Sequence, residues 1–466
     1  MNLKAFKAYD VRGRIPDEIN TDLARRIGHA YAAFVQPKKV IVGRDIRHSS
    51  EELVQALTAG LLESGVDVYD IGLCGTEGVY YATFAERMDG GIMVTASHNP
   101  PDYNGMKFVR EGSRPISGDT GLFTMRDWLA AQLTENLVPG TRFSVIGGRA
   151  GKRHVLATGG RYLEHLLGYV DRSKLRRLKV VVNAGNGGAG LIVDQLEPHL
   201  PFELVKLNNA PDGSFPNGVP NPMIEANRAP TIEAIRRSGA DVGIAWDGDY
   251  DRCFFFDEQG TFIEGYYLVG LLAEVFLKRE KGGRIVHDPR LTWNTLDVVA
   301  KNGGKAVLSK SGHAFIKQVM REVDGIYGGE MSAHHYFRDF SYCDSGMIPW
   351  LIVLQVMSET GKSLSQLVGE RMKLFPASGE INRRVPDGPA TIAAIRAKYE
   401  PKAASVDFTD GLSLEFDRWR MNLRTSNTEP LIRLNVESRG DAALMRAKTD
   451  EVLAEMAKLG AVAADH

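Results

Sequence analysis

Three acidic residues, Asp247, Asp249 and Asp251, alternate in the segment WDGDYDRC, directly after an apolar run. Carboxylates so close together either bind a cation or raise one another's pKa values by repulsion, and oxygen ligands favour a hard divalent ion. One alternative is an EF-hand, since Glu258 is the twelfth residue from Asp247, but Arg252 stands at the sixth position, where that loop needs glycine. Another is a simple hairpin turn. We favour a divalent metal site.

A second reactive loop is TASHNPPDYNGMKF, in which Ser97 follows an apolar run and precedes a turn imposed by Asn99 and Pro100. We expect an exposed hydroxyl. Serine becomes a nucleophile only with the support of a base, a metal or a cation, and His98 and Lys107 supply two of these. A capping serine in a surface turn is the alternative, which the other loops disfavour.

The segment GGEMSAHHYF mixes hydrogen-bond acceptors and donors suited to the hydroxyl groups of a ring: Glu330, Ser332, His334 and His335. Without an HExxH pattern, these residues do not imply zinc, and adjacent histidines often comprise one functional side chain and one packed neighbour.

The segment RTSNTEP places a planar cation beside small polar side chains in one turn: Arg424, Ser426, Asn427 and Thr428. This combination suits a phosphate group, although a structural turn between strands is the alternative.

A glycine-rich turn, NAGNGGAG, has the spacing of a dinucleotide fingerprint in Gly185, Gly187 and Gly190. It makes an NAD-dependent oxidoreductase the strongest competing enzyme hypothesis. However, the following strand ends in Lys206 and Leu207, without the acid that holds a ribose hydroxyl. A turn that packs a helix against its sheet also explains these glycines.

The elements that must position these loops alternate between β-branched runs and amphipathic helices. A helix is expected over residues 20–37, then a strand in KKVIVGRD and a helix in SEELVQALTAGLLESG, and the rhythm restarts at residues 178 and 283. This predicts three similar mixed α/β domains. In open α/β sheets, ligands gather beyond the carboxyl ends of the strands, so the polar loops could converge on one central cleft.

After about residue 375, one helix is followed by the close-spaced strands SVDFTD, LSLEFD, WRMNLR and LIRLNVE and a final helix. This predicts a smaller α+β domain with antiparallel strands. We place the domains at residues 1–147 with the serine loop, 148–246, 247–370 with the metal and sugar loops, and 371–466 with the phosphate turn.

Composition excludes several classes. The 466 residues carry 57 basic and 58 acidic side chains, a net charge of −1, which steers the chain toward neither nucleic acid nor membrane. Three separated cysteines support no disulfide framework, and the charged amino terminus lacks an apolar signal core. We expect a cytoplasmic protein with a small-molecule substrate; a monomer is compatible with the sequence, which does not determine the oligomeric state.

Four of these segments, together with KAYDVRG near the start, resemble the α-D-phosphohexomutases, most closely their bacterial phosphomannomutase/phosphoglucomutase branch. The four are TASHNPPDYNGMKF, DGDYDR, GEMSAHH and RTSNTEP. The resemblance spans all four domains. It implies an isomerase that interconverts hexose 6-phosphate and hexose 1-phosphate, of mannose or glucose, through phosphoserine and a hexose 1,6-bisphosphate. Mg²⁺ is the implied metal.

The resemblance also implies roles for individual residues. Ser97 would carry the phosphoryl group and, with Asp247, Asp249 and Asp251, hold the metal. Residues implied near the reacting phosphate are Tyr9, Arg12, His98, Lys107 and Arg252. Those implied to contact the sugar, its hydroxyl proton or its second phosphate are Arg290, His313, Glu330, Ser332, His334, Arg424, Ser426, Asn427 and Thr428.

Two other functions remain open besides the oxidoreductase. A phosphoglucosamine mutase is disfavoured because such relatives commonly show GEQS where this chain has GEMS, at Glu330 to Ser332. A noncatalytic protein that binds sugar phosphate or Ca²⁺ is disfavoured because every motif residue needed for catalysis is present.

Overall fold

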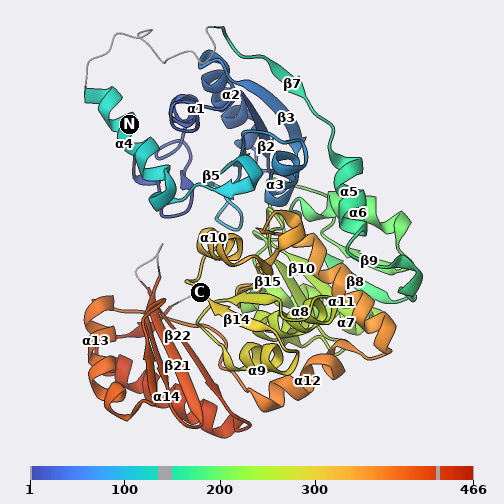
Figure 1. The fold of residues 1–466 in the computed structure, drawn as a ribbon, viewed down its shortest axis with the longest axis vertical. Helices are drawn as coiled ribbons and strands as arrows, with labels where there is room; N and C mark the ends of the chain where they lie inside the picture. Colours follow the sequence, from blue (N-terminus) through green and yellow to red (C-terminus); the bar gives the residue numbers. More distant parts are fainter. Residues whose placement is uncertain (1–2, 135–148, 427–430, 465–466) are drawn as a thin grey trace. The chain divides into compact units, whose positions relative to one another are not determined.

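The computed structural model describes residues 3–134, 149–426 and 431–464. The chain forms two compact units, one of Met1–Phe254 with Cys343–Thr360, the other of Phe255–Tyr342 with Gly361–His466. Figure 1 shows the sheets along the chain, and strand β11 (Cys253–Phe256) begins in the first unit and ends in the second.

The first sheet of the first unit has the strand order β1-β5-β4-β2-β3-β7, with β6 beside β5. Strands β2, β3, β4 and β7 run parallel, and β5 is antiparallel to its neighbours β4 and β1. The strands are β1 (Val11–Arg14), β2 (Lys39–Arg44), β3 (Asp67–Leu73), β4 (Gly90–Val94), β5 (Tyr103–Arg110), β6 (Arg114–Pro115) and β7 (Arg153–Val155).

Helices cover both faces of this sheet, because successive side chains of β2 alternate between two cores. Val40 and Val42 pack with α1 (Thr21–Val35), α2 (Ser50–Glu63) and α4 (Leu122–Thr134), whereas Ile41 packs with α3 (Thr76–Ala85). The predicted first helix begins where its cap was expected, since Asn20 Oδ1 accepts from Leu23 N at 3.0 Å.

The second region of this unit is a parallel arrangement of β8 (Lys179–Asn183), β9 (Glu203–Leu207) and β10 (Val242–Trp246). Its helices are α5 (Gly159–Leu167), α6 (Ala189–Leu196) and α7 (Ala229–Ser238). The late segment α11 (Met347–Thr360) belongs to the same unit and is buried along most of its length, which explains the apolar run IPWLIVLQVM.

The second unit begins with β12 (Phe262–Ile263), antiparallel to β11, and the long helix α8 (Gly265–Arg279). Its strands β13 (Arg284–His287), β14 (Lys305–Leu308) and β15 (Gly325–Gly329) are parallel, and β16 (His335–Phe337) is antiparallel to β15. The helices are α9 (Trp293–Lys301), α10 (His313–Val323) and, after the chain has passed through β17 (Cys343–Asp344) and α11, α12 (Leu364–Leu374).

The last region is an antiparallel sheet with the order β19-β20-β21-β22-β18-β23, drawn in red and orange in Figure 1. The four predicted strands are β19 (Ser405–Asp407), β20 (Leu412–Glu415), β21 (Trp419–Thr425) and β22 (Leu431–Ser438), and the predicted helices are α13 (Gly388–Tyr399) and α14 (Ala442–Lys458). Strands β18 (Ile381–Arg384) and β23 (Val462–Ala463) were not predicted. The first is mostly polar and the second only two residues long.

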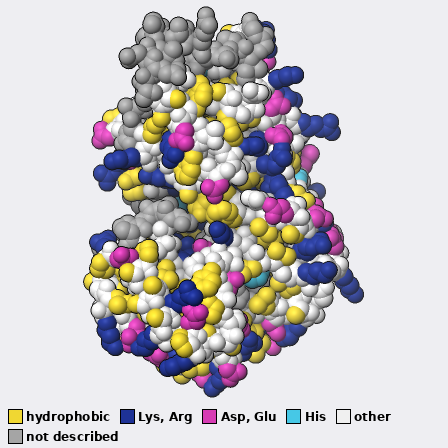
Figure 2. All heavy atoms as spheres, turned by 60° about the vertical axis from the view of Figure 1, so that its left-hand side comes forward, with side chains coloured by type: hydrophobic (Ala, Val, Ile, Leu, Met, Phe, Trp, Pro, Cys, Tyr) yellow, Lys and Arg dark blue, Asp and Glu magenta, His cyan; other side chains and the backbone are white. Residues whose placement is uncertain are grey.

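The surface agrees with the near-zero net charge. Figure 2 shows basic and acidic side chains interspersed with apolar ones over the face that it presents. Among the described residues, no helix combines the length and apolar character needed to cross a membrane.

Candidate active site

The loop after β4 holds Ser97 in an uncommon backbone conformation. Its φ of 48° lies in the left-handed region, which costs a residue with a side chain about 1–2 kcal/mol. The turn is fixed locally, because Ser97 N donates to Thr95 Oγ1 at 2.9 Å and Asn99 N donates to Ala96 O at 2.9 Å. The sequence-predicted turn is therefore present, and it is strained at the predicted nucleophile. The expected exposure of the hydroxyl is wrong, because Ser97 is buried against the aspartate loop.

Arg47 organises this loop from the segment between β2 and α2, and the sequence reasoning did not single it out. The side chain is 3% exposed, and its two terminal nitrogens donate, at 2.6–3.0 Å, to four backbone carbonyls: those of Ser97, Asn99, Pro100 and Tyr103. The available signal was its position in a polar segment that follows the carboxyl end of a predicted strand.

The three aspartates lie in the loop between β10 and β11, beside Ser97. Asp247 Oδ2 accepts from Ser97 Oγ at 2.9 Å, and one carboxylate oxygen from each aspartate lies within 4.8 Å of the others. The loop joins two strands, so the EF-hand alternative, which needs flanking helices, is wrong.

The close approach of the two loops requires a glycine at position 248. A Cβ atom there would lie 2.5 Å from Ser97 O, so any other residue would force the backbone of Ser97 to move. Thr76, which the sequence reasoning missed, joins the start of α3 to the same place: its Oγ1 donates to Asp249 Oδ2 at 2.5 Å.

Lys107 reaches this site from β5. Its Nζ lies 2.7 Å from Asp249 Oδ2 and 2.6 Å from Asp251 Oδ2. Burial favours the neutral form of both partners, but their mutual attraction is stronger, so the pKa of Lys107 is raised and that of Asp249 is lowered. Both groups are therefore charged at neutral pH.

Arg252 and His98 complete the surroundings of Ser97. Arg252 forms a 2.7 Å ion pair with Asp247 and donates from Nη2 to His98 Nδ1 at 2.6 Å. Burial lowers the pKa of His98 strongly, and Arg252 and Arg12 lower it further. His98 is thus neutral, and its Nδ1 accepts from Arg252. The same Nδ1 lies 3.0 Å from Ser97 Oγ.

Arg12 approaches the serine loop through its neighbour. Its Nη1 donates to Asn99 Oδ1 at 2.6 Å, and its Nη2 pairs with Asp10 at 2.5 Å. Tyr9, predicted to lie near the phosphate, is half-buried in the segment that leads into β1. The structure therefore brings Arg12 to the serine loop.

The donor set fits a hard divalent cation. It offers three carboxylates and the Ser97 oxygen, all of them hard ligands. Within the described part of the chain, the buried oxygen Asp249 Oδ1 has no hydrogen-bond partner, which is the state expected of an atom that completes its bonding with an ion.

A second group of predicted residues lies together in the second unit, around Arg290. Its Nη2 donates to Asp288 Oδ2 at 2.6 Å, Ser332 Oγ at 3.2 Å and Glu330 Oε1 at 3.4 Å. Glu330 is held in turn by Gly312 N at 2.8 Å. Arg290, predicted as a ligand contact, is thus adjacent to the predicted sugar contacts Glu330 and Ser332.

Glu380, which the sequence reasoning missed, links this group to Arg424. Its carboxylate lies 3.1 Å from Arg424 Nη2, 3.1 Å from Arg433 Nη1 and 3.4 Å from Arg290 Nη1. Burial alone would raise the pKa of Glu380, but the three arginines lower it to about 2. Three guanidinium groups, the donors that suit a phosphate group, thus converge on one carboxylate.

The remaining predicted residues are placed less closely. His313 is the first residue of α10, His334 stacks on Tyr336 with ring centroids 6.1 Å apart, and Ser426 Oγ accepts from Arg433 Nη2 at 3.4 Å. Asn427 and Thr428 lie outside the described residues. His335, the second histidine of the pair, is fully buried, as expected of a packed neighbour.

The glycine-rich turn after β8 serves close packing. A Cβ atom at Gly190 would lie 1.9 Å from Asn209 O, so α6 can begin here only without a side chain at that position. This is the packing explanation that the sequence offered beside dinucleotide binding.

Comparisons with known proteins decide the family. Models of the phosphoglucomutase/phosphomannomutase family match in order: α/β/α domain I at residues 3–122, domain II at 160–260, domain III at 264–375 and the C-terminal domain at 380–454. A relative from Xanthomonas campestris pv. campestris (strain B100), named phosphohexose mutases, is 59% identical over 97% of this chain and 99% of its own.

The chain belongs to the phosphoglucomutase/phosphomannomutase family. A phosphomannomutase of Escherichia coli is 56% identical over 97% of this chain and 99% of its own. A solved phosphoglucomutase/phosphomannomutase family protein from Burkholderia thailandensis is 33% identical, covers 99% of both chains and has a TM-score of 0.86. The predicted family, the fold of three α/β domains with a C-terminal domain, and the mutase class of enzyme are confirmed.

Proposed function

We propose that the protein converts hexose 6-phosphate and hexose 1-phosphate reversibly, with mannose or glucose as the sugar, and that Ser97 carries the transferred phosphoryl group. The observation that supports Ser97 most strongly is its hydroxyl, which lies 2.9 Å from Asp247 in the unit that also places Lys107 and Arg252 on the aspartates and Arg12 on the serine loop.

Two transfers account for the reaction. In the first, the bond between phosphorus and Ser97 Oγ breaks while a bond forms to a hydroxyl oxygen of the sugar, whose proton leaves to a base, for which we propose His334. The product is a hexose 1,6-bisphosphate. In the second, its other phosphoryl group returns to Ser97, and the alkoxide of the isomeric product regains a proton.

The residues around Ser97 must offset a large negative charge. Three aspartates and a phosphoserine of about −2 sum to near −5, against which Lys107 and Arg252 supply two positive charges. Asp247, Asp249, Asp251 and the serine-bound phosphate would hold Mg²⁺, which when bound supplies charge neutralisation at the phosphoryl oxygens. Lys107 and Arg252 remain fixed by their ion pairs and orient the same oxygens.

We propose that the second unit recognises the rest of the substrate. Glu330 and Ser332 offer acceptors and a donor to sugar hydroxyls, with His313 as a further contact. Arg290 and Arg424, with Ser426, Asn427 and Thr428, bind the phosphate that does not react. The convergence of three guanidinium groups, those of Arg290, Arg424 and Arg433, at Glu380 supports this division.

We further propose that the enzyme is cytoplasmic and acts on free sugar phosphates without a nucleic-acid or membrane partner. The free thiols of Cys74, Cys253 and Cys343 suit a reducing compartment.

Mass spectrometry of the purified protein tests the central assignment, because phosphate should be found on Ser97. A coupled assay with mannose 1-phosphate and glucose 1-phosphate, primed by hexose 1,6-bisphosphate, then measures substrate range. Turnover of glucosamine phosphate with neither hexose phosphate accepted would refute the proposed substrates.

A further inference from the structure

One face of the carboxyl-terminal sheet carries a ladder of polar residues that leads toward the proposed phosphate clamp. Strands β21 and β22 pair so that alternate residues stand opposite each other, while Met421, Leu423, Leu434 and Val436 point to the apolar core on the other face. The polar pairs are Arg420 with Glu437, Asn422 with Asn435, and Arg424 with Arg433.

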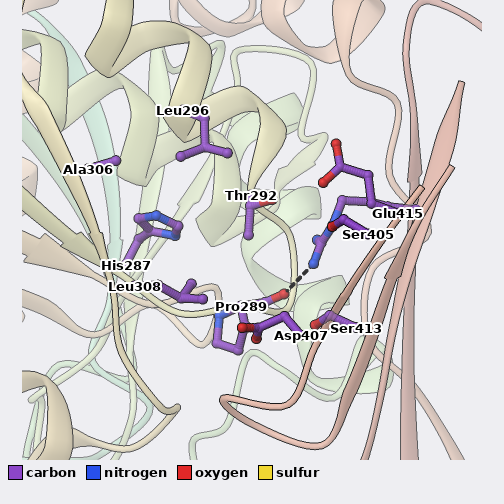
Figure 3. Close-up of a pocket in the computed structure, with 11 residues that line it drawn as sticks. His287, Pro289, Thr292, Leu296, Ala306, Leu308, Ser405, Asp407, Ser413 and Glu415 are labelled. Carbon is purple, nitrogen blue, oxygen red and sulfur yellow. Dashed lines mark hydrogen bonds between the residues drawn. The ribbon is translucent and has the colours of Figure 1, made fainter. Parts of the chain in front are cut away.

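The first pair of this ladder grips the loop that presents Arg290. Arg420 Nη2 donates to Pro289 O at 2.8 Å, the contact drawn as a dashed line in Figure 3, and Nη1 donates to Arg290 O at 3.0 Å. The same guanidinium lies 2.9 Å from Glu437 Oε1. Arg420 therefore holds two successive carbonyls of the loop, one of them from Arg290 itself.

Glu437 grips the other end of the same loop. Its Oε1 accepts from Thr292 N at 2.7 Å and from Trp293 N at 3.3 Å, the first amides of α9, and its other oxygen accepts from Tyr266 Oη. A carboxylate at a helix amino terminus is stabilised by the free amides and by the helix dipole. The side chain has no exposed surface, so these bonds form in a dry environment.

A cavity of about 230 Å³ opens beside Arg420, lined by His287, Pro289 and Thr292 from one side and by Ser405, Asp407 and Ser413 from the other. The buried pair at its edge connects the Arg290 loop to strands β21 and β22. A further polar contact lies close by, because Trp293 Nε1 donates to Glu415 Oε1 at 2.8 Å.

We propose that Arg420 and Glu437 are positioning residues that lock the Arg290 loop to the strand of Arg424, so that the two substrate-binding arginines act as one phosphate clamp. The guanidinium of Arg290 has partners of its own in Asp288, Glu330 and Glu380, so Arg420 and Glu437 would fix the backbone from which that side chain projects. The inference rests on the proposed function, because it takes Arg290 and Arg424 as contacts of the substrate.

A double-mutant cycle separates positioning from simple structural support. We expect Arg420→Met to raise KM for hexose phosphate about tenfold in the wild-type background. In the Arg290→Ala background the same change should raise KM less than about twofold, because a residue that acts through Arg290 loses its effect once that side chain is removed. Twofold is about the error with which the effects of independent sites add. Arg420→Lys keeps the charge but cannot donate to both carbonyls and Glu437 at once, so its KM should lie between that of the wild type and that of Arg420→Met.

The matched control is Arg418→Met, the same change at an exposed arginine of the same region, paired with Asp441 at 2.9 Å; its KM should equal that of the wild type. Circular dichroism verifies folding. If Arg420→Met does not fold, Glu437→Gln takes its place in the cycle, since glutamine keeps an acceptor for the α9 amides but loses the charge.

Two results overturn the proposal in distinguishable ways. If Arg290→Ala alone leaves KM unchanged, the proposed function of Arg290 is wrong and the positioning role falls with it. If Arg290→Ala raises KM but Arg420→Met has the same effect with and without Arg290, only the positioning role is refuted. Phosphate on Ser97 should be unaffected in each variant.

Discussion

Lys107 is the buried cation between two of the three aspartates, so its replacement by methionine tests the electrostatics of the site. Methionine keeps most of the apolar stem but removes the charge that lies 2.7 Å from Asp249 and 2.6 Å from Asp251. Arg252 still pairs with Asp247, so two carboxylates lose their cation. We expect two opposite effects, a loss of stability without metal and a tighter hold on Mg²⁺.

The size of the first effect follows from burial. Removing one partner of a buried ion pair costs about 3–5 kcal/mol, because the remaining charge stays desolvated. Asp249 and Asp251 are almost fully buried, so the cost in chelator should reach that range. For Mg²⁺, a unit charge about 4 Å away repels by several kcal/mol at an effective dielectric constant of about 20. Its removal should tighten the metal by about tenfold or more.

The assay is thermal unfolding in chelator and in a Mg²⁺ titration, with calorimetry for the metal affinity. Lys206→Met is the matched control, because Lys206 also lies between two carboxylates, 2.7 Å from Asp194 and 2.5 Å from Glu197, but at the surface. An exposed pair contributes about 0–1 kcal/mol. Only Lys107→Met should be strongly destabilised in chelator and rescued by Mg²⁺, while its turnover is lost.

The reasoning fails if Lys107→Met unfolds at the same temperature as Lys206→Met in chelator. It also fails if the Mg²⁺ affinity of Lys107→Met equals that of the wild type, because the lysine would then not compete with the metal for the aspartates.

Three further predictions concern metal, substrate and pH. Chelation should abolish turnover but leave sugar phosphate binding by the second unit within about tenfold of its value with Mg²⁺, as calorimetry would show. Arg424→Ala should raise KM about tenfold or more and lower kcat, because a charge-assisted hydrogen bond contributes about 1.5–3 kcal/mol. The control Arg396→Ala, at an exposed ion pair with Glu400, should leave KM and kcat unchanged. An unchanged KM in Arg424→Ala would contradict the phosphate clamp. Burial raises the pKa of Glu77 from 4.5 to about 8, so between these pH values the folded protein keeps a proton that the unfolded chain releases. The free energy of unfolding should therefore fall as the pH rises from about 4.5 to about 8. Glu77→Gln should flatten this dependence in thermal unfolding, and an equally steep decline in that variant would count against the reasoning.

Much of the fold was predictable because its signals are local. Alternating β-branched runs and amphipathic helices indicated the α/β domains, and the close-spaced strand signals, WRMNLR and LIRLNVE among them, indicated the antiparallel strands. Strand β18 was not predicted, because INRR has no apolar alternation and the strand pairs with β22, which is distant in the sequence. The domain boundaries at residues 147, 246 and 370 stay predictions.

The site was predictable where chemistry and spacing coincide within one loop, as in Ser97 with His98 or in the three aspartates. Residues that act across the sequence escaped. Arg47 holds the serine loop from 50 residues away, and Glu380 joins three arginines of separate segments. A single arginine or glutamate in a sequence carries no sign of the partners that the fold supplies.

Transfer from Ser97 is measured most directly with enzyme labelled by radioactive phosphate and mixed with unlabelled hexose 6-phosphate in a single turnover. The account predicts that label leaves Ser97 and appears in hexose 1,6-bisphosphate as fast as the enzyme turns over, and that Ser97→Ala accepts no label and isomerises nothing. Label that stays on the protein during turnover, or an active Ser97→Ala enzyme, would contradict it.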